Sequence, residues 1–252
     1  MKKITLLVLA ICLVAGNFLN AQKKDYTKPE ATELWEPVPV KVTPGDNNAP
    51  PSDAIVLFDG KNLNNWVSGN DPSKPAEWII NDDGSMTVKN GAGDIQTKQI
   101  FGNVQLHIEW KNPDKPRGLG QHRANSGVFL QGLYEVQVLD NYDNRTYSNG
   151  QAGSIYKQHI PLVNATKPSG KWQTYDIIYH APKFDSIGRK VKSATITVLH
   201  NGILVQDNVK IYGTTEYIGI PKNNPHGKGP IKLQDHGDNS GVSYRNIWIR
   251  EL

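Results

Sequence analysis

The sequence predicts an all-β protein built as a sandwich of two antiparallel sheets or as a barrel. Short apolar runs with period-two alternation recur along the chain, and no helical pattern alternates with them. Turn signals separate several of these runs, and the 23 glycines and 16 prolines suit a chain with many turns. Each sheet of a sandwich buries one face against the other sheet and leaves its second face free for polar groups.

The N-terminal segment 1–21 has the pattern of a secretory signal peptide. Two lysines precede the apolar run 4–14, and Ala21 offers a small residue for cleavage. The run is too short for a transmembrane helix, so we expect export to the periplasm or out of the cell. A lipoprotein signal centred on Cys12 is the alternative, but Ile11 occupies a position where lipoprotein processing requires a small residue.

The mature chain is close to neutral and has no cysteine. Without the two signal lysines, 26 basic residues remain beside 24 acidic residues. This balance gives no reason to expect nucleic acid or an anionic membrane as a partner. No later segment is apolar enough to span a bilayer. Cleavage after Ala21 removes the single cysteine, so an ordinary core rather than disulfides must stabilise the fold.

Residues 22–53 have the composition of an extended leader, because six prolines stand among polar residues there. A single folded domain is expected over 54–252, which is a length that one domain can fill. Its strands are expected at 55–58, 78–80, 86–88, 103–110, 126–131, 133–139, 175–179, 195–200, 203–206, 231–234 and 242–249. The residues 81–84 and 201–202 predict hairpin turns, and Asn-Gly at 201–202 is the stronger signal.

Two of these strands alternate cleanly and carry candidate catalytic side chains. Glu135 and Gln137 stand two residues apart, so they project from one face, about 6.5–7 Å apart. If the strands 103–110 and 133–139 are neighbours, His107 and Glu109 join them, and the cluster can supply both an acid and a base. The alternative is a solvated sheet face with no chemistry.

Gln234 and His236 form a second candidate pair near the end of a later strand. Histidine titrates near neutrality and can serve as an acid or a base. A surface histidine beside a turn explains the same pattern.

Several aromatic residues could line a cleft for a sugar, because the apolar face of a pyranose stacks on aromatic rings. Trp66, Trp172, Tyr142 and Tyr156 are expected in loops or at strand ends, although each could be structural. Trp248 is assigned to core packing.

No cofactor is expected. The chain has no Cys-x-x-Cys, His-Glu-x-x-His or Gly-x-Ser-x-Gly pattern. Asp140, Asp143 and Asn144 could place oxygens around Ca²⁺ or another divalent metal. Their spacing is not that of an EF-hand, however, and such residues are common in turns.

Six ordered blocks of the sequence resemble the 3-keto-disaccharide hydrolase family, long carried as a domain of unknown function. The first is LFDGKNLNNW at 57–66, and the others are at 101–110, 125–140, 152–156, 229–237 and 245–250. The resemblance spans about residues 54–252.

This resemblance implies a concanavalin A-like jelly roll that cleaves glycosides whose glucose unit carries a ketone at C3. The ketone acidifies the hydrogen on C2. A base then removes this proton, an acid helps the C1 oxygen leave, and water adds to the unsaturated sugar. Polarity, strand phase and motif position make Glu135 the candidate principal acid/base, with Glu109 and His236 as alternatives or partners. The candidate substrate-binding residues are His107, Asn125, Gln137, Gln234, Tyr156 and Trp172.

Two other functions fit the same sequence. A lectin-like carbohydrate-binding module would use the same polar strand face and aromatic rim without catalysis, and the fold does not decide between the two. A scaffold attached to an envelope partner through the Pro-rich leader is the third possibility. The expected partner in the first two cases is a carbohydrate.

Overall fold

The computed structural model describes residues 25–252, so the predicted signal peptide lies outside the described residues. The chain divides into two units, Met1–Lys41 and Val42–Leu252. The described part of the first unit holds a single 3₁₀ turn, η1 (Pro29–Ala31). The strands that the structure describes all belong to the second unit.

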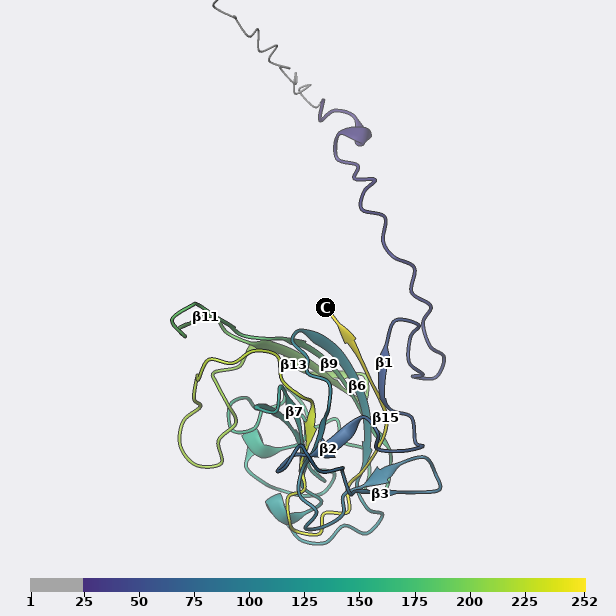
Figure 1. Ribbon diagram of the computed structural model, residues 1–252, viewed down its shortest axis with the longest axis vertical. Coiled ribbons are helices and arrows are strands. Elements are labelled where there is room, and N and C mark those ends of the chain that lie inside the picture. The colour runs from purple at the N-terminus through teal and green to yellow at the C-terminus, as the bar shows by residue number, and fades with distance from the viewer. Residues whose placement is uncertain (1–24) are drawn as a thin grey trace, which may run out of the picture. The chain divides into compact units, whose positions relative to one another are not determined.

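Two antiparallel sheets make up the second unit (Figure 1). The larger sheet has eight strands in the order β13-β12-β9-β6-β15-β4-β3, and β1 also pairs with β15. Its strands are β1 (Ile55–Phe58), β3 (Ile79–Ile80), β4 (Met86–Thr87), β6 (Val104–Lys111), β9 (Gln173–His180), β12 (Thr195–His200), β13 (Ile203–Lys210) and β15 (Ser243–Glu251).

The smaller sheet has five strands in the order β2-β5-β14-β7-β8. Its strands are β2 (Trp66–Ser68), β5 (Ile95–Thr97), β7 (Ser126–Leu130), β8 (Tyr134–Val138) and β14 (Lys232–Leu233). A separate hairpin of β10 (Lys183–Phe184) and β11 (Lys190–Lys192) and the 3₁₀ turns η2 (Gly120–His122) and η3 (Ser148–Gly150) complete the described elements. The expected all-β sandwich of antiparallel sheets is confirmed.

The Asn-Gly hairpin is also confirmed. Asn201 and Gly202 have φ angles of 53° and 78°, and His200 pairs with Ile203 across the turn. Positive φ at both central residues is the type I′ geometry, whose twist matches that of the flanking strands.

The core lies between the inner faces of the two sheets. Alternation along β6 points Val104, Leu106, Ile108 and Trp110 inward, and all four are fully buried. The smaller sheet contributes Ile95, Val128, Leu130, Val136, Val138 and Leu233 to the same cluster. Burial of each such side chain stabilises the fold by about 1.5–3 kcal/mol.

Three tyrosines of the larger sheet tie the smaller sheet to it through hydrogen bonds across the core. The O–H groups of Tyr175, Tyr179 and Tyr244 donate to the Gln137 carbonyl oxygen, Gln131 Oε1 and Ser126 Oγ, each at 2.7 Å. The acceptors lie on β7 and β8 or in the turn between them, so these bonds fix the two strands against the core.

Two tryptophans have surroundings other than those expected. Trp66 lies at a strand end, as the first residue of β2, but it is buried rather than at the rim of a cleft, and it donates its Nε1–H to the Leu57 carbonyl oxygen at 2.9 Å. Trp248 is buried as expected, but it lies on the outer face of the larger sheet, where it stacks on His107 with ring centroids 5.1 Å apart.

The strands β2 and β5 are too short to leave an alternation signal in the sequence.

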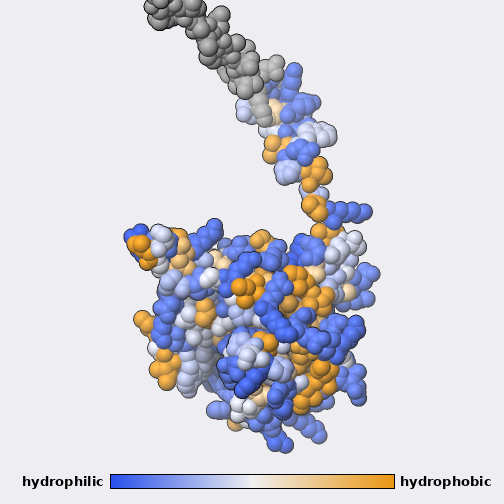
Figure 2. All heavy atoms as spheres, in the orientation of Figure 1, coloured by the Kyte–Doolittle hydropathy of each residue, from blue (hydrophilic) through white to orange (hydrophobic). Residues whose placement is uncertain are grey.

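The surface of the second unit is mixed in polarity. Figure 2 shows hydrophobic atoms gathered near β1 and β3, where Val56, Ile79 and Ile80 are exposed. Within residues 25–252, no helix has both the length and the apolar character needed to cross a bilayer.

Candidate functional site

The outer face of the smaller sheet carries a cluster of polar side chains. Strand pairing places Glu135 opposite Phe129 and Gln137 opposite Gly127. Phe129 is in turn opposite Lys232 on β14. Side chains two residues apart in a strand share a face. Asn125 therefore lies on the same face as Gly127 of β7, and Gln234 and His236 lie on the same face as Lys232 of β14.

These side chains surround a hollow of about 240 Å³. It is lined by Asn125, Phe129, Glu135, Gln137, Tyr156, Thr215, Tyr217, Gln234 and His236. Six of the nine residues that the sequence nominates therefore lie around a single cavity. The expected roles of these residues stay predictions.

Glu135 is a buried carboxyl group that borders this hollow. Its side chain is only 4% exposed, and burial raises its pKa to about 8, although the Lys232 ammonium partly opposes this effect. Lys232 forms its own ion pair with Asp94 at 3.0 Å and stands 4.2 Å above the Phe129 ring. A carboxyl group whose pKa lies near physiological pH can both take up and release a proton there.

Gly127 leaves the space that Glu135 occupies. A Cβ atom at this position would lie 2.6 Å from Glu135 Oε1 and 2.8 Å from Phe129 Cε2. The glycine at the second position of β7 is therefore a packing requirement of the carboxyl group on the neighbouring strand.

Two side chains that line the hollow each carry a buried amide oxygen without a hydrogen-bond partner among the described residues. These atoms are Asn125 Oδ1 and Gln234 Oε1, and both are buried. The Asn125 amide is oriented by its Nδ2–H, which donates to the Gln121 carbonyl oxygen at 2.8 Å. Buried polar atoms are nearly always paired, so these acceptors favour a ligand that carries hydroxyl groups.

The amide of Gln137 connects Glu135 to the loop before β7. Its Nε2 lies 2.9 Å from Gln121 Oε1, and rotating the amide by 180° instead brings the nitrogen within 3.0 Å of Glu135 Oε1. In the second orientation, Gln137 donates directly to the carboxyl group. It would then stabilise the ionised form.

His236 stands at the end of the β14 segment and is oriented by Asp238. The His236 Nδ1 atom lies 3.0 Å from Asp238 Oδ2, and the His236 side chain is 29% exposed. The preceding residue, Asp235, accepts hydrogen bonds from the backbone N–H groups of Gly91 and Gly93. This contact ties the loop that carries His236 to the turn before β5.

A second hollow of about 410 Å³ adjoins the first. Tyr156, Tyr217 and His236 line both hollows, and the second is further lined by Gln121, His122, Thr146, Tyr147 and Lys157. The two hollows therefore form one site with two chambers, which we call the first and second chambers.

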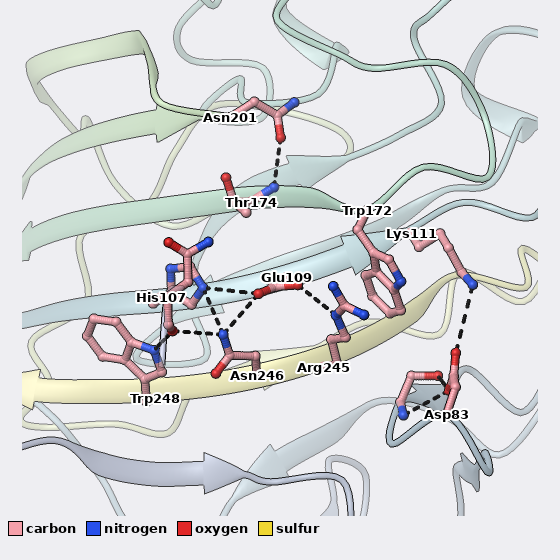
Figure 3. A network of polar contacts seen from close by, with 12 residues as sticks. Asp83, His107, Glu109, Lys111, Trp172, Thr174, Asn201, Arg245, Asn246 and Trp248 are labelled. Atoms are coloured by element: carbon pink, nitrogen blue, oxygen red, sulfur yellow. Dashed lines mark hydrogen bonds and ion pairs between the residues drawn. The ribbon is translucent and has the colours of Figure 1, made fainter. Parts of the chain in front are cut away.

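The expectation that His107 and Glu109 join Glu135 is wrong. Their strand β6 belongs to the larger sheet and β8 to the smaller sheet, so the core separates the two pairs. Trp172 is also away from the chambers, because its ring packs under the Arg245 guanidinium at 4.1 Å and near the Lys111 ammonium at 4.9 Å (Figure 3).

His107 and Glu109 instead belong to a polar network on the outer face of the larger sheet (Figure 3). Glu109 accepts hydrogen bonds from Arg245 Nε at 2.7 Å and Asn246 Nδ2 at 2.9 Å, and His107 Nδ1 lies 2.7 Å from Asp176 Oδ1. Asn246 has a φ of 46° at a break in the β15 register, a bulge that asparagine tolerates.

The network holds the segment before β1. The Asn48 carbonyl oxygen accepts hydrogen bonds from Asn246 Nδ2 at 2.9 Å and Trp248 Nε1 at 3.1 Å. Arg250 and Asp53 form an ion pair at 2.6 Å. Part of the predicted leader is thus packed on β15, which gives the network a structural role.

The outer network predicts a pH dependence of stability. Burial alone would lower the pKa of His107, but its contacts with Asp176 and Glu109 prevail and raise the pKa to about 9. The protonated form is therefore favoured in the folded state. The contribution of protonated His107 to the stability of the fold is complete below the pKa of about 6.5 that histidine has in the unfolded chain. It is lost as the pH rises through about 9.

We expect the free energy of unfolding to fall by about 1–3 kcal/mol more in the native protein than in His107→Gln between pH 6.5 and 9. Urea titrations at several pH values measure this difference. His180→Gln, on the same strand face as Asp176, is the matched control and should follow the native protein. Parallel pH curves for the native protein and His107→Gln would contradict the prediction.

Asp140 is occupied by protein contacts rather than placed around an open metal position. It accepts hydrogen bonds from Arg123 Nε at 3.2 Å, Ser169 Oγ at 2.6 Å and the Tyr142 N–H at 3.2 Å. Asn144 is also used internally, because its Nδ2 donates to the Asp140 carbonyl oxygen. Among residues 25–252, no group of three or more His, Cys, Asp or Glu side chains is arranged to hold a metal ion.

Several residues that line the chambers give no clear signal in the sequence. Thr215 and Tyr217 come from a loop without periodicity, and His122, Tyr147 and Lys157 come from two other irregular segments. Their strongest sequence signal is the aromatic character of the tyrosines, which many structural residues share.

Comparison with known proteins agrees with this fold. The profile of the 3-keto-alpha-glucoside-1,2-lyase-like domain family matches residues 53–250. A candidate glycosyl hydrolase from Parabacteroides distasonis, known from its crystal structure, shares 54% sequence identity with this chain. The alignment covers 89% of this chain and 97% of that chain, with a TM-score of 0.86. A second candidate glycosyl hydrolase from that organism is 20% identical over 79% of this chain and 94% of that chain, with a TM-score of 0.57, and supports the fold alone. No curated protein matches the chain.

Proposed function

Because this chain belongs to the 3-keto-alpha-glucoside-1,2-lyase-like domain family, we propose that it cleaves glycosides whose glucose unit carries a ketone at C3. The observation that carries the proposal is Glu135, a buried carboxyl group with a pKa of about 8 at the wall of the first chamber. A base of this strength suits a C2 hydrogen acidified by the neighbouring ketone.

The proposed reaction begins when the Glu135 carboxylate takes the C2 proton. The electron pair of the C2–H bond becomes part of an enolate, which then forms the C1–C2 double bond as the bond from C1 to the bridging oxygen breaks. The leaving oxygen receives a proton from His236, whose ring is oriented by Asp238. Water then adds across the double bond: its oxygen bonds to C1 while His236 takes up its proton, and Glu135 returns a proton to C2. Both residues are thereby regenerated, and the overall reaction is hydrolysis.

The other side chains of the first chamber would orient the sugar. Asn125 Oδ1 and Gln234 Oε1 can accept hydrogen bonds from its hydroxyl groups, which would pair both buried oxygens. Phe129 and Tyr156 supply aromatic surface beside them. These contacts would bind the sugar, and a buried carboxyl group with a raised pKa favours a catalyst over a lectin.

The test is selectivity for the ketone. We expect the protein to release methanol from methyl 3-keto-α-glucoside and to leave methyl α-glucoside intact, because only the ketone acidifies C2. Chromatography of the two reactions measures this. Binding of the keto sugar without release would favour the lectin-like module, and equal cleavage of both compounds would contradict the enolate route.

We also propose that the mature protein acts outside the cytoplasm, on the basis of the signal-peptide pattern at 1–21. The mass of the chain recovered from cells tests this proposal, because cleavage after Ala21 leaves Gln22 at the N-terminus.

A further inference from the structure

The second chamber contains a positive charge without a counter-ion, the ammonium group of Lys157. Lys157 lines this chamber, and no ion pair among the described residues includes it. Two other lysines nearby are paired, Lys232 with Asp94 at 3.0 Å and Lys222 with Glu216 at 3.2 Å. The Lys157 charge is therefore free to attract a ligand of opposite charge.

Aromatic rings position the Lys157 ammonium without neutralising it. Its Nζ lies 4.4 Å from the ring centroid of Tyr217, 5.6 Å from that of Tyr156 and 5.7 Å from that of Tyr147. Ring faces attract a cation but carry no net charge. The ammonium also donates to the Tyr217 carbonyl oxygen at 2.5 Å. Since an ammonium group has three N–H donors, two remain for a ligand.

The backbone of Lys157 adopts a conformation that is uncommon for a residue with a side chain. Its φ is 57°, in the left-handed region. The Lys157 N–H donates to the Asn149 carbonyl oxygen at 2.7 Å, which helps to hold this conformation. Such residues persist only where surrounding contacts fix them, and they cluster at binding and catalytic sites. The strained backbone is thus a second observation that favours a binding role for Lys157.

The rest of the second chamber adds no negative charge. None of its eight described lining residues is Asp or Glu, and two of them are histidines, His122 and His236, with ring centroids 6.4 Å apart. The carboxylate of Asp238 is engaged by His236 Nδ1 at 3.0 Å. An excess of positive charge in a hollow raises the local concentration of anions. The second chamber therefore favours an anionic group over a neutral one of the same shape.

We infer that the second chamber selects leaving groups that carry a carboxylate, with Lys157 as the specificity-determining residue. A carboxylate matches the charge of one ammonium group, whereas a phosphate group carries nearly two negative charges. The inference rests on the proposed function for one step. Glu135 lines the first chamber alone, so a leaving group attached to the ring that reacts there would extend into the second chamber.

The experiment measures whether a carboxylate on the leaving group strengthens binding to Glu135→Gln, which cannot turn the ligands over. Isothermal titration calorimetry compares 4-carboxyphenyl 3-keto-α-glucoside with its neutral 4-carbamoylphenyl counterpart, because the two have nearly the same shape. We expect the carboxylate to bind about 5- to 10-fold more tightly. Added Lys157→Met should reduce this ratio below about twofold, whereas Lys157→Arg should retain most of it, and salt should lower it.

A second pair of ligands tests an aliphatic acid in place of an aromatic one. These ligands are 3-keto-α-glucosyl glycerate and 3-keto-α-glucosyl glycerol, which differ in a carboxylate and a neutral hydroxymethyl group. Preference for the charged member of either pair supports the inference, and the pair with the larger ratio identifies the kind of acid that the chamber prefers.

Lys192→Met is the matched control, because Lys192 is an exposed lysine that lines neither chamber. It should leave the ratio unchanged. Equal binding of the charged and neutral members of both pairs would overturn the inference. Equal weakening of all ligands by Lys157→Met would also overturn it, since Lys157 would then only hold the Tyr217 loop. Turnover of the neutral glycosides by the native protein is measured separately, and its absence would refute the proposed function instead.

Discussion

Replacing Glu135 with Gln is expected to lower kcat for 3-keto-α-glucosides by about 10²- to 10⁴-fold while the fold is retained. Gln has almost the same shape as the protonated carboxyl group, so it fits the space that Gly127 leaves. It cannot accept the C2 proton. Steady-state kinetics with the methyl glycoside measure the loss, and circular dichroism checks the fold.

The same substitution should stabilise the protein at alkaline pH. Burial raises the pKa of Glu135 to about 8, so between the unfolded value of about 4.5 and about 8 the folded state binds more protons than the unfolded state. Stability of the native protein therefore falls as the pH rises through this range. Above pH 8, Glu135→Gln should gain at least about 1 kcal/mol, or roughly 2–4 °C in Tm, relative to the native protein.

Glu77→Gln is the matched control, because Glu77 is an exposed carboxyl group that lines neither chamber. It should leave both kcat and Tm close to the native values. In the native enzyme, kcat should rise with pH toward the pKa of Glu135, since the ionised form acts as the base. Full activity of Glu135→Gln would remove Glu135 from the proposed role.

The second large effect is expected for His236→Gln, and its size should depend on the leaving group. With a sugar or methanol as the leaving group, kcat/KM should fall about 100-fold, because the departing alkoxide needs a proton. With 4-nitrophenolate, which leaves without protonation, the loss should be less than about fivefold. A series of 3-keto-α-glucosides with different leaving groups measures this dependence.

The variant Asp238→Asn distinguishes the effect of losing the orientation of the His236 ring from the effect of losing the ring itself. It retains His236 but replaces the carboxylate that contacts Nδ1, so its loss should be smaller, about tenfold, with the same preference for good leaving groups. His159→Gln, which lines neither chamber, should have no effect. A loss that is equal for all leaving groups would assign His236 to sugar binding rather than to acid catalysis.

The face on which each strand carries its polar residues could be predicted from the sequence. Alternation places Glu135 and Gln137 on one face of β8, and the same rule aligns Gln234 with His236. This signal is local, because the backbone of an extended chain points successive side chains to opposite sides whatever lies beside it. The hairpin at 201–202 was predictable for the same reason, since Asn and Gly adopt positive φ without help from distant residues.

The identity of the neighbouring strands was decided only by the tertiary structure. His107 and Glu109 show the same alternation as Glu135 and Gln137, yet they lie on the outer face of the other sheet, where they hold the segment that contains Asn48. The alternation gives the face of a strand but not its sheet, because pairing depends on contacts between residues far apart in the chain. The place of Tyr217 and Thr215 in the site also depends on contacts between distant parts of the chain. Long-range hydrogen bonds to β8 and to the turn before it position the loop that carries them.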